Sequence, residues 1–291
     1  MEIFVKPNFN FVDHRKIPYV ICIIFIILTV IGLVRGINYG VDFQGGTLLQ
    51  YNFTQVVAAE EIRNVLDEFD LSASTIQRFS DNEVAIRTPQ LTLDQRNQLT
   101  DTLRNQIGEL EIVRNEEVGP TVGGELRRAA YLALLFSIIG ILIYVGIRFE
   151  LRPAVTSVLA LANTGIMTLG LVALLGIEFD TTILAAMLTI LGYSINDSIV
   201  VMDRIRERLN YRKREDAKTL INTSLNETLS RTIMTGTTTI IAVIILYFFG
   251  GKMLQPFALT MLIGLIFGTF SSIFVAAMLF YEWEVKKPLR R

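Results

Sequence analysis

Residues 181–207 of the chain read TTILAAMLTILGYSINDSIVVMDRIRE. The first part of this stretch, residues 181–202, is long and apolar enough to cross a hydrocarbon core of about 30 Å as one helix. It contains a single carboxylate, Asp197, at a position where an aspartate costs roughly 2.5 to 3.5 kcal/mol in lipid. Such residues usually face a bundle interior or a hydrated cavity and serve ion or proton traffic. The stretch therefore predicts a membrane-spanning helix that carries a functional carboxylate.

Runs of similar length and apolarity occur elsewhere in the chain. Of its 291 residues, 51% are hydrophobic and only 19% are charged, and the mean hydropathy is +0.46. This pattern predicts a polytopic α-helical membrane protein with six transmembrane helices. The predicted helices cover residues 17–35, 127–148, 153–175, 181–203, 232–250 and 256–280. The first run lacks an A-x-A-like cleavage site, so we expect it to be retained as a transmembrane helix.

The short loops differ in their content of lysine and arginine, and this difference sets the orientation of a membrane protein. The connection at residues 204–231 is the most basic, and the segments at residues 1–16 and 281–291 also carry several lysines and arginines. We expect these three segments, and so both termini, to be cytoplasmic.

The polar block at residues 36–126, between the first two predicted helices, is large enough for a domain of its own. The spacing of its apolar residues predicts strands and helices in the order β-α-β-β-α-β. This order predicts an α+β ferredoxin-like domain, which we expect to lie outside the cytoplasm. The predicted strands are residues 47–53, 74–79, 84–88 and 111–114, and the predicted helices are residues 58–69 and 92–107. Between Gly36 and Gly124 lie fourteen acidic residues, six arginines and no lysine. This acidity argues against nucleic acid as a partner, and it suits either basic polypeptides or the solvation of an exported domain.

The sequence lacks several well-known catalytic motifs. Residues 250–252 (GGK) have neither the upstream glycine nor the following hydroxyl residue of a phosphate-binding loop. No H-E-x-x-H or G-x-S-x-G motif occurs, and one cysteine (Cys22) with one histidine (His14) excludes a zinc site. Asp197 and Asp203 lie on different faces of one helix and cannot share a proton directly. We therefore expect neither enzymatic activity nor a metal or organic cofactor.

The remaining candidate is a polar path through the fourth and fifth predicted helices. Asp197 and Arg231, which opens the fifth helix, are predicted to form its centre. Supporting polar residues lie close to them on the same two helices: Tyr193, Ser194, Asn196, Arg204 and Thr235. If the two helices meet, Arg231 reaches Asp197 directly or through water and keeps it ionised, whereas separation or desolvation lets it bind a proton. The alternative is that Asp197 only hydrogen-bonds between helices and Arg231 only extends to the membrane interface.

Small residues in two other predicted helices indicate close helix packing. They are Gly165 and Gly170 in the third helix and Gly264 and Gly268 in the sixth. Such spacing is common in membrane helix bundles and does not specify a function.

Three stretches of the chain resemble motifs of the SecF family, in the resistance-nodulation-division superfamily. They are residues 40–47 (GVDFQGGT), 192–207 (GYSINDSIVVMDRIRE) and 231–235 (RTIMT). The motif residues in the first stretch are Gly40, Asp42, Gly45 and Gly46. The resemblance covers essentially the full length, including one large loop and six spans.

The resemblance implies a multi-pass protein of the bacterial cytoplasmic membrane that pairs with SecD. It also implies that the protein lies in the lipid bilayer and has the SecYEG translocon, YajC, YidC and translocating preproteins as further partners. In this family the proton motive force promotes preprotein translocation and release outside the cytoplasm, with the proton as the coupling ion. Asp197 and Arg231 match the residues that act in this coupling.

Two other functions remain open from the residues alone. The first is a half-size proton-coupled exporter of small molecules or lipids from the same superfamily. A single small external domain argues against this function, because it leaves little room for a small-molecule binding site. The second is an intramembrane enzyme, which needs a second catalytic group beside Asp197 that the sequence does not show.

Overall fold

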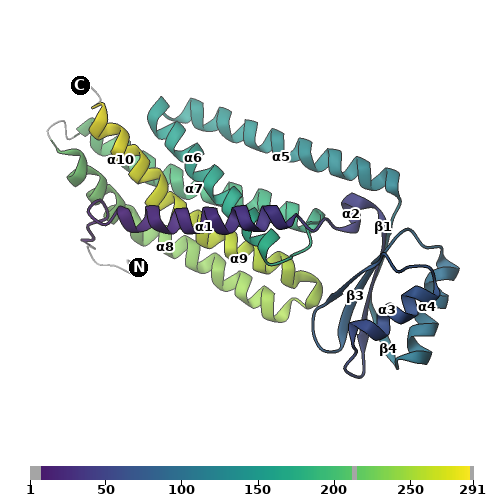
Figure 1. Cartoon of the computed structure of the whole chain (residues 1–291). Coiled ribbons are helices and arrows are strands. Elements are labelled where there is room, and N and C mark those ends of the chain that lie inside the picture. The colour runs from purple at the N-terminus through teal and green to yellow at the C-terminus, as the bar shows by residue number, and fades with distance from the viewer. Residues whose placement is uncertain (1–7, 212–214, 289–291) are drawn as a thin grey trace. The chain divides into compact units, whose positions relative to one another are not determined.

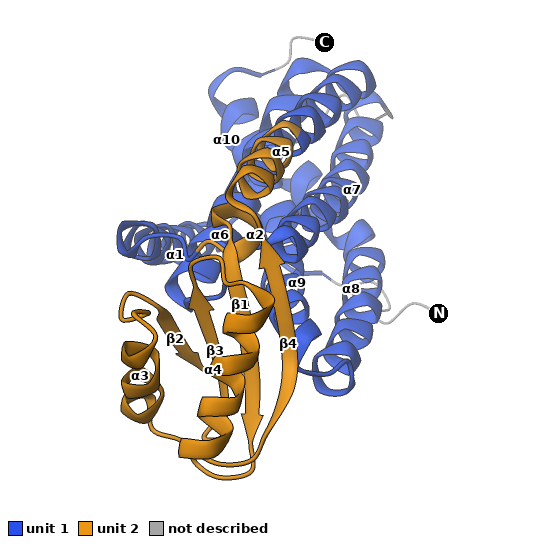
Figure 2. Ribbon diagram, turned by 90° about the vertical axis from the view of Figure 1, so that its right-hand side faces the viewer, with its two compact units in different colours: residues 1–38, 133–291 blue, residues 39–132 orange. Residues whose placement is uncertain are grey.

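The computed structural model describes residues 8–211 and 215–288. The chain forms two compact units, shown in different colours in Figure 2. Unit 1 comprises residues 1–38 and 133–291, and unit 2 comprises residues 39–132. Within the described residues, the strands all belong to unit 2, and the regular structure of unit 1 is helical.

Six helical segments are long and apolar enough to cross a membrane, which confirms the predicted multi-pass helical architecture (Figure 1). The first five are α1 (Lys16–Arg35), α5 (Pro120–Arg148), α6 (Leu151–Leu174), α7 (Thr181–Tyr211) and α8 (Ala217–Phe249). The sixth consists of a 3₁₀ turn η1 (Lys252–Leu254), α9 (Gln255–Phe270), a π-helical segment η2 (Ser271–Ala276) and α10 (Ala277–Lys286). Because α7 and α8 extend beyond the predicted spans, most of the basic connection at residues 204–231 is helical.

The helices of unit 1 differ in how deeply they are buried. In the most apolar stretch of α6 and of α7, half of the residues are buried. The buried share is 61% in the sixth segment and 11% in α5. Glycines allow the central helices to approach closely, because a Cβ at Gly264 would collide with the Ile190 side chain and one at Gly170 with Thr29. The predicted close packing around these glycines is confirmed.

Residues 8–15, which precede α1, pack on the helices instead of extending into solvent. The Asn226 side chain of α8 binds the Phe9 backbone twice, accepting from its N–H at 2.8 Å and donating to its carbonyl at 2.8 Å. Asn222 accepts from the Val12 N–H at 3.0 Å, and the Val12 side chain is fully buried. His14 remains exposed, as expected for a residue of this segment. This docking has no signal in the local sequence, because it depends on partners more than 200 positions away in the chain.

Unit 2 contains a four-stranded antiparallel sheet with strand order β2-β3-β1-β4. After the short helix α2 (Val41–Gln44), its elements are β1 (Gly46–Phe53), α3 (Ala59–Glu68), β2 (Thr75–Arg78), β3 (Glu83–Thr88), α4 (Leu93–Gln106) and β4 (Leu110–Val118). Buried residues of α3 and α4 share one core cluster with Tyr51 and Phe53 of β1 and Ile86 of β3. The start of α4 is fixed by a capping box in which the Thr92 hydroxyl accepts from the Gln95 N–H at 3.3 Å.

Candidate functional site

Asp197 lies in the interior of α7, and only 3% of its surface is exposed. Two groups of α8 act on its carboxyl: the Thr235 hydroxyl, which lies near it, and the Arg231 guanidinium, through its charge. Among the described residues, no cation lies within ion-pair distance of this carboxyl. The structure therefore brings Asp197, Thr235 and Arg231 onto facing helices without closing an ion pair.

Thr235 is suited to either protonation state of Asp197. Its hydroxyl donates to a backbone carbonyl in its own helix, with Arg231 O and Thr232 O both at 3.0 Å. In that rotamer the hydroxyl oxygen can accept a hydrogen bond from a protonated carboxyl, and after rotation the hydroxyl can donate to a carboxylate. Asp197 can therefore gain or lose its proton while the Thr235 hydroxyl keeps its hydrogen bonds.

Tyr193 joins α7 and α8 one helical turn from Asp197. Its hydroxyl donates to the Thr235 carbonyl at 3.2 Å and also contacts the Thr239 hydroxyl. Tyr193 and Asp197 are four residues apart and so share one face of α7, as predicted. This face is the one that meets the threonine-rich side of α8.

Ser194 belongs to a different contact from the one predicted. Its hydroxyl lies 3.2 Å from that of Thr164 on α6, and its carbonyl accepts from the Ser272 hydroxyl of η2 at 3.1 Å. The Ser198 hydroxyl, one turn further along, lies 2.9 Å from the Ser272 hydroxyl. Ser194 thus serves the packing of α7 against α6 and η2, away from α8. Helical periodicity could not show this, because the π-helical turn that positions Ser272 changes the register of the sixth segment.

Asn196 lies on a third face of α7 and is exposed. Three other exposed residues follow the same face at spacings of three or four: Ala185, Thr189 and Gly192. We call these four residues the α7 strip. A strip of small and polar residues on a membrane helix is typical of a surface that packs against another helix.

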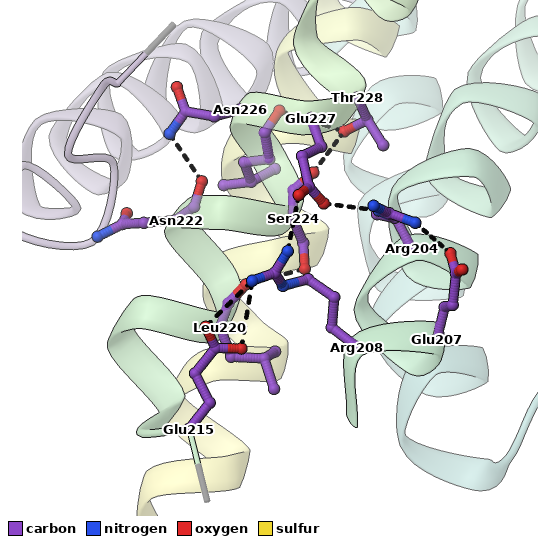
Figure 3. A network of polar contacts seen from close by, with 11 residues as sticks. Arg204, Glu207, Arg208, Glu215, Leu220, Asn222, Ser224, Asn226, Glu227 and Thr228 are labelled. Atoms are coloured by element: carbon purple, nitrogen blue, oxygen red, sulfur yellow. Dashed lines mark hydrogen bonds and ion pairs between the residues drawn. The ribbon is translucent and has the colours of Figure 1, made fainter. Parts of the chain in front are cut away.

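Arg204 does not extend the path from Asp197 but belongs to an ion-pair network between α7 and α8 (Figure 3). Its Nε lies 2.6 Å from a Glu227 carboxylate oxygen, and its guanidinium also contacts Glu207. Glu227 binds Arg208 as well, at 2.7 Å, and Arg208 reaches Glu215 at 3.1 Å. Only 8% of the Arg208 side chain is exposed, so this network is largely shielded on its inner side.

The glycine motif after α1 lies in unit 2, where α2, β1 and β3 meet. Gly40 caps α2, and Asp42 lies in its first turn. Gly45 and Gly46 have φ values of +75° and +124°, which favour glycine. A Cβ on Gly45 would lie 2.9 Å from Pro120 Cα, and one on Gly46 would lie 2.5 Å from the Thr88 carbonyl oxygen. The double glycine is therefore required by backbone conformation and by close backbone contacts.

Comparison with known proteins places the chain in a family. Residues 98–286 match the family described as "Protein export membrane protein SecD/SecF, C-terminal", and residues 30–55 match the "SecD/SecF GG Motif". The chain belongs to the SecD/SecF family. The resemblance inferred from the motifs is thereby confirmed, and the double glycine is part of a family motif.

Curated relatives and a solved structure agree with this assignment. "Protein translocase subunit SecF" of Desulfurispirillum indicum is 42% identical, over 96% of this chain and 94% of that protein. The protein of the same name from Haemophilus influenzae is 40% identical, over 97% and 88%. A crystal structure of a Thermus SecDF, described as a translocon-associated membrane protein, superposes with a TM-score of 0.89 at 37% identity, over 96% of this chain. This chain spans 39% of that longer SecDF chain.

Proposed function

We propose that the chain is the SecF subunit of the bacterial Sec protein-export machinery, and that with SecD it uses the proton motive force to promote preprotein translocation and release outside the cytoplasm. The observation that supports the coupling role is the Asp197 carboxyl, buried within a spanning helix, with Thr235 and Arg231 on the facing helix and no ion pair closed. A buried carboxyl in this setting can exist in either charge state.

The coupling step follows from this geometry. When α7 and α8 bring Arg231 and water towards Asp197, the carboxylate form is stabilised and the neutral acid releases its proton. When they move apart, the low-dielectric surroundings favour the neutral acid, so the carboxylate binds a proton from the other side. Tyr193 acts as a positioning residue, because its contacts with Thr235 and Thr239 hold the two helices together one turn away. The proton is the only coupling ion, and the chain has no enzymatic step.

The exposed polar surface supports SecD as the partner in the membrane. Asn196 of the α7 strip and Arg231, Thr237 and Thr238 of α8 are all exposed in the single chain. Polar groups of this kind are costly against lipid and usually face another helix or a hydrated cavity. We assign this surface to SecD, and assign SecYEG, YajC, YidC and the preprotein as the remaining partners.

We also infer where the chain lies and how it is oriented. The chain is a multi-pass protein of the bacterial cytoplasmic membrane, with residues 1–16, 204–231 and 281–291 on the cytoplasmic side. Unit 2 lies outside the cytoplasm as a ferredoxin-like sandwich, which its element order β-α-β-β-α-β and its sheet order support.

The test is the replacement Asp197→Asn, which keeps the shape of the side chain but cannot ionise. Inverted membrane vesicles containing the full complex should lose the part of preprotein release that depends on the proton gradient. The matched control is Asp203→Asn on the same helix, because Asp203 is half-exposed and pairs with Arg148 at 2.8 Å. Unchanged gradient-dependent release in the correctly inserted Asp197→Asn protein would refute the coupling role.

A second experiment tests the assigned SecD surface. Gly192→Leu places a bulky side chain on the α7 strip, and it should reduce co-purification of SecD from membranes. Gly140→Leu is the control, because Gly140 is also exposed on a spanning helix and has open space at its Cβ. Equal recovery of SecD with both variants would place the interface elsewhere.

A further inference from the structure

An apolar cavity of about 340 Å³ lies between α5, α6 and α7 in unit 1. Its lining consists of aliphatic side chains, methionine, alanine and glycine, and includes Leu134, Ile138, Leu142, Leu161, Gly165 and Leu191. None of these residues takes part in the Asp197 site or in the ion-pair network. The cavity therefore needs its own explanation.

The cavity is continuous with the outer surface of the helical bundle. Of its lining residues, Leu142 on α5 is 42% exposed and Ile166 on α6 is 53% exposed. The neighbouring Ile143, at 57% exposure, continues the same apolar surface along α5. In a multi-pass membrane protein this surface faces hydrocarbon, so the cavity opens towards the lipid.

We propose that this cavity binds the acyl chain of a membrane phospholipid. Water is a poor occupant, because it needs two to four polar partners and the lining offers no polar side chain. An empty space would leave the lining atoms without dispersion contacts, which a slender acyl chain restores.

Positive charge at one end of the hairpin of α5 and α6 complements the phosphate of such a lipid. The Arg206 guanidinium donates to the Arg148 carbonyl at 3.4 Å where α5 ends, and the Arg148 guanidinium pairs with Asp203 at 2.8 Å. Arg148 lies about 9 Å along the helix axis from Leu142, at about 1.5 Å per residue. A phospholipid whose chain enters the cavity from this end places its phosphate near Arg206, whose charge is additional to the Arg148–Asp203 pair.

The proposal is independent of proton coupling and can be tested by photolabelling. The full complex is reconstituted in nanodiscs with a phospholipid that carries a diazirine near the end of one acyl chain, and adducts are located by mass spectrometry. We expect adducts at Ile138 and Leu142. In Ala162→Phe, which fills the cavity from its exposed mouth, these adducts should be lost while those at the lipid-facing Ile24 of α1 persist.

Two further variants make the result decisive. Gly165→Leu fills the cavity from its floor, next to the flexible Leu191 side chain, and should give the same loss. Gly140→Leu adds the same side chain outside the cavity and should leave the adducts unchanged. Unchanged adducts at Ile138 and Leu142 in both filled variants would overturn the proposal. So would a protein adduct, in place of a lipid adduct, from a photo-crosslinking amino acid placed at Ile138 in cell membranes.

Discussion

Asp197 on α7 and Glu227 on α8 are carboxylates of neighbouring helices, and they differ in the charged groups around them. Glu227 is held by two guanidinium groups, Arg204 at 2.6 Å and Arg208 at 2.7 Å. Asp197 is more deeply buried, yet it has a hydroxyl partner and only a more distant guanidinium. The first arrangement fixes a charge, and the second leaves the charge free to change.

Energetics explain why the two arrangements suit different tasks. A carboxylate that is fully paired resists protonation, because losing its charge would leave its cations uncompensated. A buried carboxyl without a closed ion pair is near balance between desolvation, which favours the neutral acid, and a nearby cation, which favours the carboxylate. A change in the distance between Arg231 and Asp197 can therefore change the proton occupancy of Asp197, whereas Glu227 stays charged as long as Arg204 and Arg208 remain in contact with it.

The largest expected effect comes from Asp197→Asn. Gradient-dependent preprotein release should fall about a hundredfold, the lower end of the range for removing a positioned proton-transfer group. The free energy of unfolding in detergent should not fall, because the variant removes a buried ionisable group that has no salt bridge to lose. A variant that kept its activity but lost stability would show that Asp197, like Glu227, has a structural role.

The next effect is the reverse, and it comes from Glu227→Gln. We expect the free energy of unfolding, measured by reversible unfolding in mixed micelles, to fall by about 2 kcal/mol, because Arg208 is left buried with one carboxylate fewer. Glu207→Gln is the control. Within the part of the chain that the structure describes, Glu207 is 53% exposed and pairs with Arg204 alone, so its loss should cost about 0.5 kcal/mol. Equal losses in the free energy of unfolding for the two variants would show that the contribution of a carboxylate does not depend on its shielding from solvent.

Sequence and structure agree best where a pattern is local and repeated. Apolar runs of sufficient length gave the six spanning helices, and the spacing of four residues placed Tyr193 and Asp197 on one face of α7. In unit 2 the alternation of apolar residues located β1 within one residue of its start, at Gly46. These features depend on residues that are close in the chain.

The disagreements arise where the outcome depends on distant partners. Ser194, which was predicted to support the polar path, contacts α6 and η2 in the structure, because the π-helical segment η2 brings Ser272 to its carbonyl. Arg204 was taken as part of the path from Asp197, but Glu227, 23 positions further along the chain, pairs with it instead. The docking of Phe9 and Val12 on α8 has no local signal at all, because two asparagines in a helix are ordinary in sequence.

A third prediction concerns Asn226, which precedes Glu227 and anchors by neutral hydrogen bonds instead of charge. Asn226→Ala removes both bonds to the Phe9 backbone and should lower the free energy of unfolding by about 1 kcal/mol. Amide exchange at Phe9 should accelerate, while that of the Leu49 amide in unit 2 stays unchanged. Asn222→Ala, which removes the bond to Val12, should act similarly. An effect as large as that of Glu227→Gln would mean that charge adds nothing to anchoring at this end of α8.

The smallest effect is expected at the exposed pair of Asp13 and Lys218, whose charged groups lie 2.7 Å apart. The hydrogen bond from Lys218 holds the pKa of Asp13 below its ordinary value of 3.8. Because the folded state then binds this proton less tightly than the unfolded state, the stabilisation is present above 3.8 and is lost as the pH falls through the lowered pKa. Asp13→Asn should therefore change the midpoint of thermal unfolding only slightly at neutral pH, and the difference from the parent chain should vanish in acid. If Asp13→Asn instead destabilised the chain as much as Glu227→Gln, the number of ion pairs, and not their shielding from solvent, would decide which carboxylates hold the helices together.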